Sequence, residues 1–437
     1  MKGSLLRGLF LVGLVGFGGG SALIPVVERE LVDRRKLLSA EDYVRHTVVA
    51  NITPGALPVK LAASAGLTLG GWGLAVLAVL AVTLPGVVGT ISLMALSDFL
   101  GPAALRVISS ASVGITAFIV VLLIGYIVKV HVGSGQLPLF VLITATAASL
   151  TSLDPLVKLI GTAFQFEPSA QPPRMDAVVL IVGALLGIVV VTLFSSRGRE
   201  PRLMRQRKFP IAAMRPALLA CAAFLALTAV GLVAFAVLLP NGARLGALLA
   251  LSSITSFGGG EAYIAVADGY FVKPGFVDAA TFYTQLVPIA NALPGPILVK
   301  VAAGVGYLVG APHGTAIALL LATAATFVAA GACCALMLPV LGAYLWLRKE
   351  PIVINIGRYI LPVICGLLIS VSATMLDVAA KVGEEAGVAP GPLLIVMLLA
   401  IALMTWLHLK RLASDILMLV LAGGASLLLL SILGPPA

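Results

Sequence analysis

The sequence predicts an all-α integral membrane protein built from two inverted structural repeats, each with broken or re-entrant helices. Three observations support this. Of the 437 residues, 60% are hydrophobic and only 11% are charged. Apolar segments long enough to cross a bilayer recur along the chain. The segment "FGGGSALIP" at Phe17 returns as "FGGGEAYIA" at Phe257. We expect about nine full spans and about four half-membrane segments, with about 13 full spans as the alternative.

Composition narrows the classes of function. The formal net charge of +10 is better explained as a topology signal than as a nucleic-acid surface, so we expect no nucleic-acid partner. The cysteines show no CxxC spacing and no histidine cluster, which argues against zinc or a disulfide framework; they are Cys221, Cys333, Cys334 and Cys365. The histidines stand singly, as loop or interface residues do: His46, His131, His313 and His408. We expect no metal and no cofactor.

A shift of 240 residues aligns 17–66 with 257–306 without a gap. The identities include Phe17/Phe257, Gly18–Gly20/Gly258–Gly260, Ile24/Ile264, Tyr43/Tyr283, Asn51/Asn291, Pro54/Pro294, Gly55/Gly295, Lys60/Lys300 and Gly66/Gly306. This is a duplicated fold unit. Lys2, Arg7 and the apolar run after them are typical of a signal peptide, but the internal copy of FGGG places the first copy in the mature fold.

The domain prediction follows the repeats: 1–194 forms the first, 195–240 is a basic loop plus a linker helix, and 241–437 forms the second. Each repeated core is followed by apolar segments that are long enough to be spans. They lie near 74–97, 107–128, 137–153 and 177–194, and near 314–340, 352–376, 392–407 and 415–433, with an unpaired span at 217–239.

Charge predicts the topology. Loop 195–216 is rich in arginine and is expected in the cytoplasm by the positive-inside rule. Alternating the spans outward from it places an acidic loop with Asp377, Glu384 and Glu385 outside. The first core, 8–66, then starts inside and the second, 245–306, starts outside. Inverted repeats of this kind are typical of secondary transporters.

Each core contains two broken segments joined by a polar linker. The first linker, 28–45, is basic, whereas 268–285 holds only Lys273 among basic residues. This asymmetry favours segments that enter and return from opposite faces over segments that all cross. Glu28 and Asp268 occupy matching positions at the ends of these segments, and we expect both to be solvated.

The glycines and prolines predict an anion site. Irregular backbone at membrane depth is tolerated where it is buried in protein or lines a wet cavity, and helix N-termini there present N–H groups to anions. "NITPGALPVK" (51–60) and "NALPGPILVK" (291–300) are interpreted as helix, break and new helix, and each GGG as a second break. The predicted substrate-binding residues are Gly18, Gly19, Gly20, Asn51, Pro54, Gly55, Lys60, Gly258, Gly259, Gly260, Asn291, Pro294, Gly295 and Lys300.

Three kinds of side chain have an alternative interpretation. Lys60 and Lys300 suit a dianion, but a membrane lysine also reaches toward the interface. Asn51 and Asn291 either donate to the substrate or cap the break. Glu261 follows the second GGG, where the first repeat has Ser21. It is predicted to carry a proton coupled to transport, or to be a structural partner of Lys300 or of helix N–H groups. A phosphate-binding loop is disfavoured because no GK[ST] follows the glycines.

The stretch "FGGGSALIPVVERELVDRRKLLSAEDY" with "NITPGALPVKLAASAG", and "FGGGEAYIA" with "NALPGPILVK", resembles the chromate ion transporter family in its long-chain, two-domain form. The resemblance covers both repeats. It implies a multi-pass prokaryotic inner-membrane transporter that expels chromate, driven by protons, with sulfate as a similar substrate. This chain departs from the family in having PGA at Pro54–Ala56 and a lysine after "PV" and "LV".

The leading hypothesis is a secondary transporter of chromate or a related tetrahedral oxyanion, working by alternating access with proton-coupled efflux. An uncoupled anion channel is the first alternative. A membrane-embedded enzyme is less favoured, because its acidic and histidine clusters are missing from the sequence pattern. The expected partners are the oxyanion, protons and the lipid bilayer, and a homodimer is compatible with the sequence.

Overall fold

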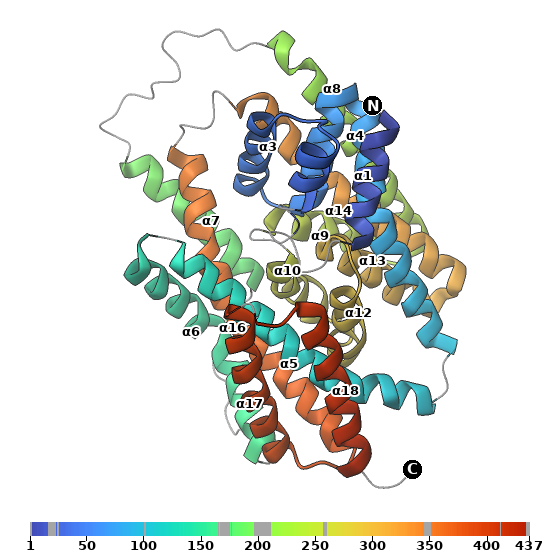
Figure 1. The fold of residues 1–437 in the computed structure, drawn as a ribbon, viewed down its shortest axis with the longest axis vertical. Coiled ribbons are helices and arrows are strands. Elements are labelled where there is room, and N and C mark those ends of the chain that lie inside the picture. Colours follow the sequence, from blue (N-terminus) through green and yellow to red (C-terminus); the bar gives the residue numbers. More distant parts are fainter. Residues whose placement is uncertain are drawn as a thin grey trace. The chain divides into compact units, whose positions relative to one another are not determined.

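Figure 1 shows the fold in a computed structural model of the chain. The structure describes residues 2–15, 23, 26–99, 102–133, 135–164, 166, 175, 177–195, 211–256, 260–344, 351–410 and 412–433. Every regular element within these ranges is a helix, and none is a strand. The all-α class predicted from the hydrophobic segments is therefore confirmed.

The elements before the second repeat are α1 (Lys2–Val15), the π-helical turn η1 (Arg29–Arg34), α3 (Ala40–Ile52), α4 (Leu57–Phe99), α5 (Pro102–Val132), α6 (Leu137–Phe164), α7 (Ala177–Ser195) and α8 (Ile211–Leu238). Those that follow are α9 (Gly242–Thr255), α10 (Gly260–Ala267), the π-helical turn η2 (Asp268–Val272), α11 (Ala279–Thr281), the π-helical turn η3 (Phe282–Leu286), α12 (Val287–Ala292), α13 (Ile297–Gly310), the 3-10 turn η4 (Ala311–His313), α14 (Thr315–Gly342), α16 (Pro351–Glu385), α17 (Pro390–Leu409) and α18 (Asp415–Leu433).

The helix boundaries repeat with the sequence. Helices α1 and α9 begin and end at matching positions of the two repeats. Helices α4 and α13 also begin at matching positions. Helix α4 is not continuous: Gly70 and Gly71 have non-helical dihedral angles, with φ +79° at Gly71. Helix α13 ends at Gly310, the position that matches Gly70. The two parts of α4 thus correspond to α13 and α14.

Seven helices of the described chain are long and apolar enough to cross a membrane. Each of the nine apolar segments expected to span lies within a helix, to within one residue at either end. The helices are α4 after its kink, α5, α6, α7, α8, α14, α16, α17 and α18. By contrast, α1, α9 and α13 have 14 residues each and α10 has 8. These pieces are shorter than the about 20 residues that a helical span needs. The cores therefore consist of broken helices, as predicted.

The chain folds into two compact units, and each unit takes segments from both repeats. Unit 1 comprises Met1–Ile91, Val179–Val266 and Pro294–Leu361, and unit 2 comprises Ser92–Val178, Ala267–Leu293 and Pro362–Ala437. The repeats are therefore interleaved in space rather than folded as separate domains.

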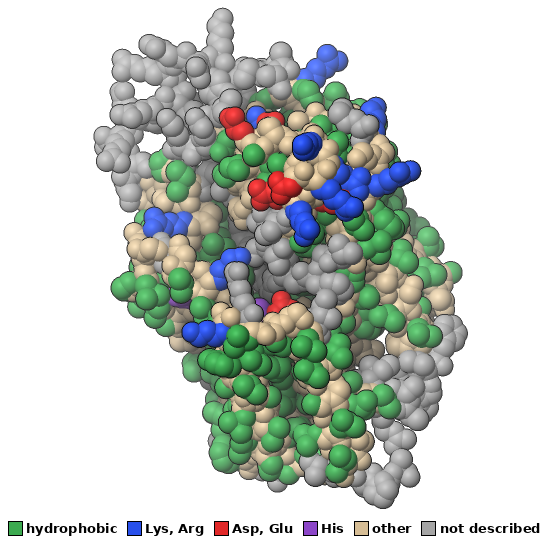
Figure 2. Space-filling model, viewed as in Figure 1, with side chains coloured by type: hydrophobic (Ala, Val, Ile, Leu, Met, Phe, Trp, Pro, Cys, Tyr) green, Lys and Arg blue, Asp and Glu red, His purple; other side chains and the backbone are tan. Residues whose placement is uncertain are grey.

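Unit 1 is packed through small residues. Helices α8 and α14 lie against each other, and a Cβ on Gly331 of α14 would come within 2.8 Å of the Phe224 carbonyl oxygen of α8. Helix α13 returns against α14, where a Cβ on Gly306 would come within 2.9 Å of the Ala325 side chain. Such close approach between backbones is how membrane helices gain van der Waals contact. Charged side chains gather over the end of the unit formed by α1 and α3 (Figure 2).

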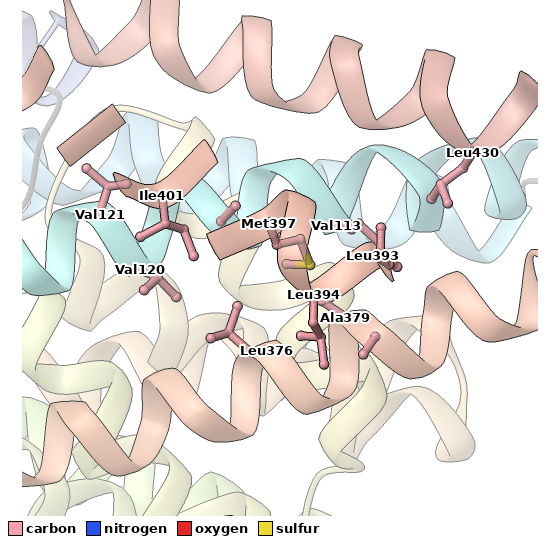
Figure 3. Packing of buried hydrophobic residues seen from close by; sticks show 12 residues of the cluster. Val113, Val120, Val121, Leu376, Ala379, Leu393, Leu394, Met397, Ile401 and Leu430 are labelled. Atoms are coloured by element: carbon pink, nitrogen blue, oxygen red, sulfur yellow. The ribbon is translucent and has the colours of Figure 1, made fainter. Parts of the chain in front are cut away.

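Unit 2 has an apolar core between α5, α16, α17 and α18 (Figure 3). In that view Val121 of α5 lies beside Ile401 of α17 at one end, and Val113 lies beside Leu393 at the other, so α5 and α17 run parallel. The visible outer faces of α17 and α18 are hydrophobic (Figure 2). Hydrophobic outer faces are expected of helices that contact lipid.

The helix directions in unit 2 show that the repeats are inverted there. Helices α5 and α6 form a hairpin, in which His131 near the end of α5 contacts Phe140 near the start of α6. Helix α6 runs parallel to α16, because the Thr144 hydroxyl donates to the Pro362 carbonyl and the Ser370 hydroxyl donates to the Thr151 carbonyl. Helix α16 is therefore antiparallel to α5. These two helices hold the same place in their repeats, each following the core and its long helix.

One sequence expectation about charge was wrong. Asp377 was placed in an acidic external loop with Glu384 and Glu385, but all three lie within α16. Asp377 is buried, and it accepts a hydrogen bond from the Thr162 hydroxyl of α6 (2.5 Å) and from the Lys381 ammonium (2.8 Å). The helix continues past its apolar part because this carboxylate has partners and needs no water.

Candidate functional site

The break in the first repeat is made by proline and glycine. Helix α3 ends at Ile52, and its C-cap Thr53 is extended, with φ −100° and ψ 147°. Gly55 has φ +103°, a conformation that costs little only for glycine. The new helix α4 begins at Leu57. The sequence prediction of a helix, a break and a new helix is confirmed at this point.

Lys60 is directed at the end of the helix before the break. Its side chain is 1% exposed. The ammonium donates to the carbonyl oxygens of Ala50 and Thr53, both at 2.5 Å, and to that of Pro54 at 3.1 Å. These carbonyls belong to the last turn of α3 and to the break, where intrahelical partners run out and the helix dipole is negative. The lysine thus neutralises a helix C-terminus.

The sequence allowed two interpretations of Lys60, contact with a dianion or a side chain that reaches the membrane interface, and the structure tests the second. The alternative in which the side chain reaches the membrane interface is wrong, because the ammonium is buried on backbone oxygens. An ammonium has three N–H donors. Since three carbonyls receive them, an oxyanion would have to replace some of these contacts. The predicted contact with substrate remains a prediction.

The second break repeats the first. Helix α12 ends at Ala292, with its C-cap Leu293 at φ −94° and ψ 147°. Gly295 has φ +99°, and α13 begins at Ile297 after the N-cap Pro296. Lys300 is again 1% exposed. The same sequence at the same offset has therefore produced the same backbone twice.

Within unit 1, each break packs against helices of the other repeat. The Gly55 N–H donates to the Ser256 carbonyl oxygen at the end of α9, at 2.6 Å. A Cβ on Gly55 would lie 2.7 Å from the Cβ of Cys333 on α14. The second break packs in the same way against helices of the first repeat. Glycine is needed where a helix passes this close to a break.

The second break meets α1 and α4. A Cβ on Gly295 would be 3.4 Å from the Gly13 carbonyl oxygen and 3.5 Å from the Gly86 Cα. On α4, a Cβ at Gly86 would be 2.6 Å from the Pro294 carbonyl oxygen and 3.0 Å from Cδ of Lys300. The stem of Lys300 therefore lies against Gly86. The sequence pattern had no signal for Gly86, Cys333 or Ser256, because all three lie outside the aligned repeat cores or at their edge.

The two asparagines behave alike. Asn51 donates its side-chain amide to the Thr47 carbonyl and Asn291 donates to the Val287 carbonyl, both at 2.8 Å and both four residues back. Asn51 is exposed and Asn291 is half-buried. Each amide thus bonds back onto the last turns of its own helix, just before the break. A role in substrate binding stays a prediction for both.

The GGG segments are only partly described. Gly18, Gly19, Gly20, Gly258 and Gly259 lie outside the described residues. In the second repeat, α9 ends at Thr255 and α10 begins at Gly260. Ser256, the C-cap of α9, is extended, with φ −82° and ψ 109°, so α9 ends before the second GGG. Glu261 is in the first turn of α10, and its proposed proton coupling stays a prediction.

A buried charged cluster in unit 2 was missed. Asp268 is 3% exposed, so the expectation that it is solvated was wrong. Its carboxylate accepts a hydrogen bond from the Tyr283 hydroxyl at 2.8 Å and pairs with the Lys273 ammonium at 3.2 Å. These contacts tie η2 to η3. In the first repeat Tyr43 lies beside Glu28. The identity Tyr43/Tyr283 was the signal available in the sequence.

The comparisons with known proteins agree on a class. The family model described as "Chromate transporter" matches residues 3–188 and again 243–428. Two proteins of Bacillus subtilis (strain 168) are similar in sequence, each named an uncharacterized transporter. YwrA is 34% identical over 90 residues, which are 21% of this chain and 51% of YwrA, and YwrB is 33% identical over 93 residues, 21% of this chain and 47% of YwrB. The chain thus spans about half the length of these curated relatives. No solved structure matches it.

Proposed function

The chain belongs to the chromate transporter family, whose model matches both repeats, and from this premise we propose that it carries a tetrahedral oxyanion across the membrane. The family is one of transporters rather than enzymes, and the spans make this a multi-pass membrane protein. The proposed substrate is chromate, or a related dianion such as sulfate. The proposed location is the inner membrane of a prokaryote, with loop 195–216 in the cytoplasm.

The observation that carries the proposal is the paired break. Two Pro-Gly breaks, each followed five residues later by a buried lysine, lie in unit 1 and pack against helices of the opposite repeat. Helices α4 and α13 start directly after the breaks, and helix N-termini favour anions. We propose that the oxyanion binds at these N-termini, with donors from the GGG segments and the two asparagines.

Lys60 can have different partners in the two states of the proposed transport cycle. In the described geometry its ammonium is held by carbonyls at the end of α3. A dianion at the break competes for the same three protons, because charge-assisted hydrogen bonds to an anion are stronger than those to neutral carbonyls. We propose that Lys60 exchanges carbonyls for substrate during alternating access, that Lys300 does the same in the second repeat, and that efflux is coupled to protons through Glu261.

The test is flux of radiolabelled chromate into proteoliposomes, with and without an imposed pH gradient and with excess sulfate. Lys60→Met and Lys300→Met are compared with Lys60→Arg and Lys300→Arg, which keep the charge. We expect gradient-dependent uptake, inhibition by sulfate, and a loss of about tenfold or more in each Met variant, as for removal of one charge-assisted hydrogen bond. Size-exclusion profiles show whether each variant is folded.

The outcomes separate the proposals. Flux that ignores the gradient favours the alternative, an uncoupled anion channel. Folded protein with no chromate or sulfate flux contradicts the proposed substrate class. Normal flux in both folded Met variants removes the lysines from the binding site and leaves them with the structural role that their carbonyl contacts define.

A further inference from the structure

The first break is closed by groups of the second repeat. The Gly55 N–H donates to the carbonyl oxygen of Ser256, the C-cap of α9, at 2.6 Å. The next N–H, that of Ala56, is directed at the thiol of Cys333 on α14 as a hydrogen-bond donor. Both N–H groups directly precede α4, and Pro58 in its first turn has no N–H. Two of the few backbone donors at this helix end are therefore already occupied.

The partners of the Cys333 thiol fix its donor and acceptor roles. The Ser253 carbonyl oxygen of α9 lies 3.7 Å from the sulfur and can only accept, so the thiol donates to it. The Ala56 N–H can only donate, so the sulfur accepts from it. The thiol thus joins the last turn of α9 to the start of α4.

The contact between α14 and the break is close. A Cβ on Gly55 would lie 2.7 Å from the Cβ of Cys333 and 3.3 Å from its Cα. One residue further along α14, the Cys334 sulfur lies 3.9 Å from the Val59 carbonyl oxygen of α4. Both cysteines are fully buried, and Lys60 lies near both thiols. An oxyanion therefore has no room beside Gly55 until the Cys333 side chain moves.

The second break differs from the first in two ways. The three atoms nearest to a Cβ built on Gly295 are all backbone, the carbonyl oxygen of Gly13 and the Cα and nitrogen of Gly86, at 3.4–3.7 Å. The residue that matches Ala56 is Pro296, which has no N–H. The N–H at position 56 and the thiol that it meets thus belong to the first break alone.

We propose that Cys333 competes with the oxyanion for the N–H groups at the start of α4, so that anion binding at the first break displaces the thiol. An anionic oxygen is a stronger acceptor than a thiol sulfur, because charge-assisted hydrogen bonds are stronger than those between neutral groups. The apparent affinity for the anion is reduced by the free energy of the thiol contacts that it has to break. This inference rests on the proposed oxyanion site and names a residue that sets its affinity.

The exchange links the substrate to the opposite repeat. Cys333 and Ser253 belong to the second repeat and Ala56 belongs to the first. When the anion takes the Ala56 N–H, the hydrogen bond that joins α14 to α4 is lost. Alternating access requires the two repeats to move against each other, and substrate binding at this point removes one of the contacts that oppose the movement.

The test is the affinity of the full chain in lipid nanodiscs for sulfate, measured by isothermal titration calorimetry. Sulfate is the probe because it does not oxidise thiols. Cys333→Ala removes the sulfur, and Cys333→Ser keeps an acceptor. Cys365→Ala is the matched control, because it makes the same change at a fully buried cysteine of unit 2.

We expect Cys333→Ala to lower the dissociation constant for sulfate by about two- to tenfold, which corresponds to the net contribution of one hydrogen bond. The change in Cys333→Ser should be smaller, and Cys365→Ala should equal the parent protein. A dissociation constant in folded Cys333→Ala that is unchanged or raised overturns the proposal. Size-exclusion profiles show whether each variant is folded.

A proline at position 56 tests the competition at the N–H itself. Ala56→Pro removes this N–H and copies the second break, where Pro296 has φ −68°. The anion then loses a donor, so we expect the dissociation constant to rise, and Cys333→Ala should no longer change it. An unchanged dissociation constant in Ala56→Pro overturns the proposal even if Cys333→Ala does not fold. An effect of Cys333→Ala that persists in the double variant overturns it as well.

Flux assays separate this inference from the proposed function. In proteoliposomes, Cys333→Ala should lower the KM for sulfate, whereas a purely structural role would change stability and leave KM unaltered. If the variants bind sulfate as expected but no oxyanion is transported, the inference holds and the proposed transport fails. If transport is normal and all variants bind sulfate alike, the inference fails and the proposed function holds. A folded parent protein that neither binds nor transports an oxyanion contradicts both.

Discussion

The break in unit 1 and the helices of unit 2 hold their buried charges in different ways. In unit 1 the Lys60 ammonium rests on backbone carbonyls at a helix end, with no carboxylate among the contacts described. In unit 2 the buried carboxylates Asp268 and Asp377 each face a lysine, Lys273 and Lys381, together with a hydroxyl. The contacts of the Lys60 ammonium depend on the backbone conformation at the break. The contacts of the two carboxylates depend on which side chains the neighbouring helices and turns bring to them. The exchange of Lys60 between carbonyls and substrate that we propose would depend on the first arrangement.

The most damaging way to break the unit 1 arrangement is to add a methyl group at the break. In Gly55→Ala the new Cβ meets Cys333, and alanine must adopt φ +103°. We expect a loss of about 2–5 kcal/mol in the free energy of unfolding, from left-handed strain and overpacking together. Unfolding in detergent measures it. Gly71→Ala is the matched control, because Gly71 has φ +79° with nothing within 4 Å. Equal losses in the two variants would contradict the role given to Cys333.

Removing the cation of unit 1 tests the arrangement more directly. Lys60→Met keeps the volume but leaves the Ala50, Thr53 and Pro54 carbonyls without their donor. We expect about 2–4 kcal/mol of destabilisation, because buried acceptors lose a charged partner. Lys60→Arg should recover part of this. A Met variant as stable as the parent protein would show that the carbonyls find other donors.

In unit 2 the same kind of change should cost less. Asp268→Asn keeps an acceptor for the Tyr283 hydroxyl and removes the charge that faces Lys273, whose side chain is 16% exposed and can turn toward water. We expect about 1–3 kcal/mol. Tyr283→Phe should cost about 1 kcal/mol. A double-mutant cycle measures their coupling, and additive losses would mean that the 2.8 Å hydrogen bond contributes no coupling to stability.

The smallest effect is expected at the edge of unit 2. Lys381 pairs with Asp377, but its side chain is 57% exposed, so water competes for the ammonium. We expect Lys381→Met to change stability by at most about 0.5 kcal/mol. Thr162→Val, which removes the half-buried hydroxyl bonded to the same carboxylate, should cost more. If the order is reversed, the lysine rather than the hydroxyl holds Asp377 in α16.

The sequence predicts local breaks well and their partners poorly. The Pro-Gly breaks at Gly55 and Gly295 and the inverted long helices follow from residue type, hydrophobic length and charge, and the structure agrees at these positions. The partners of Lys60 depend on the extended Thr53 turning its carbonyl back toward the lysine, which a pattern of residue types does not specify. Asp268 was misjudged because its burial depends on Tyr283, fifteen residues later in a neighbouring π-helical turn.

Asp377 was misjudged for a different reason. Acidic residues after an apolar stretch usually mark its exit from the membrane, and Glu384 and Glu385 reinforced that interpretation. Its partner Thr162 is contributed by α6 of the other repeat, so the relevant contact is distant in sequence. Composition and periodicity do not predict contacts between single polar residues that are far apart in the sequence.

The hydrogen bond between Gly55 and Ser256 has a consequence for how the protein is made. The first break leaves the ribosome long before its partner has been synthesised, so its amide reaches the membrane without the carbonyl that completes it. The early half of the chain must then wait in an unfinished form, shielded by lipid, by the insertion machinery or by water, until the later half arrives. Final assembly of the first core is therefore a late event in biogenesis. Two halves expressed from separate messages would have to find each other before either core is finished.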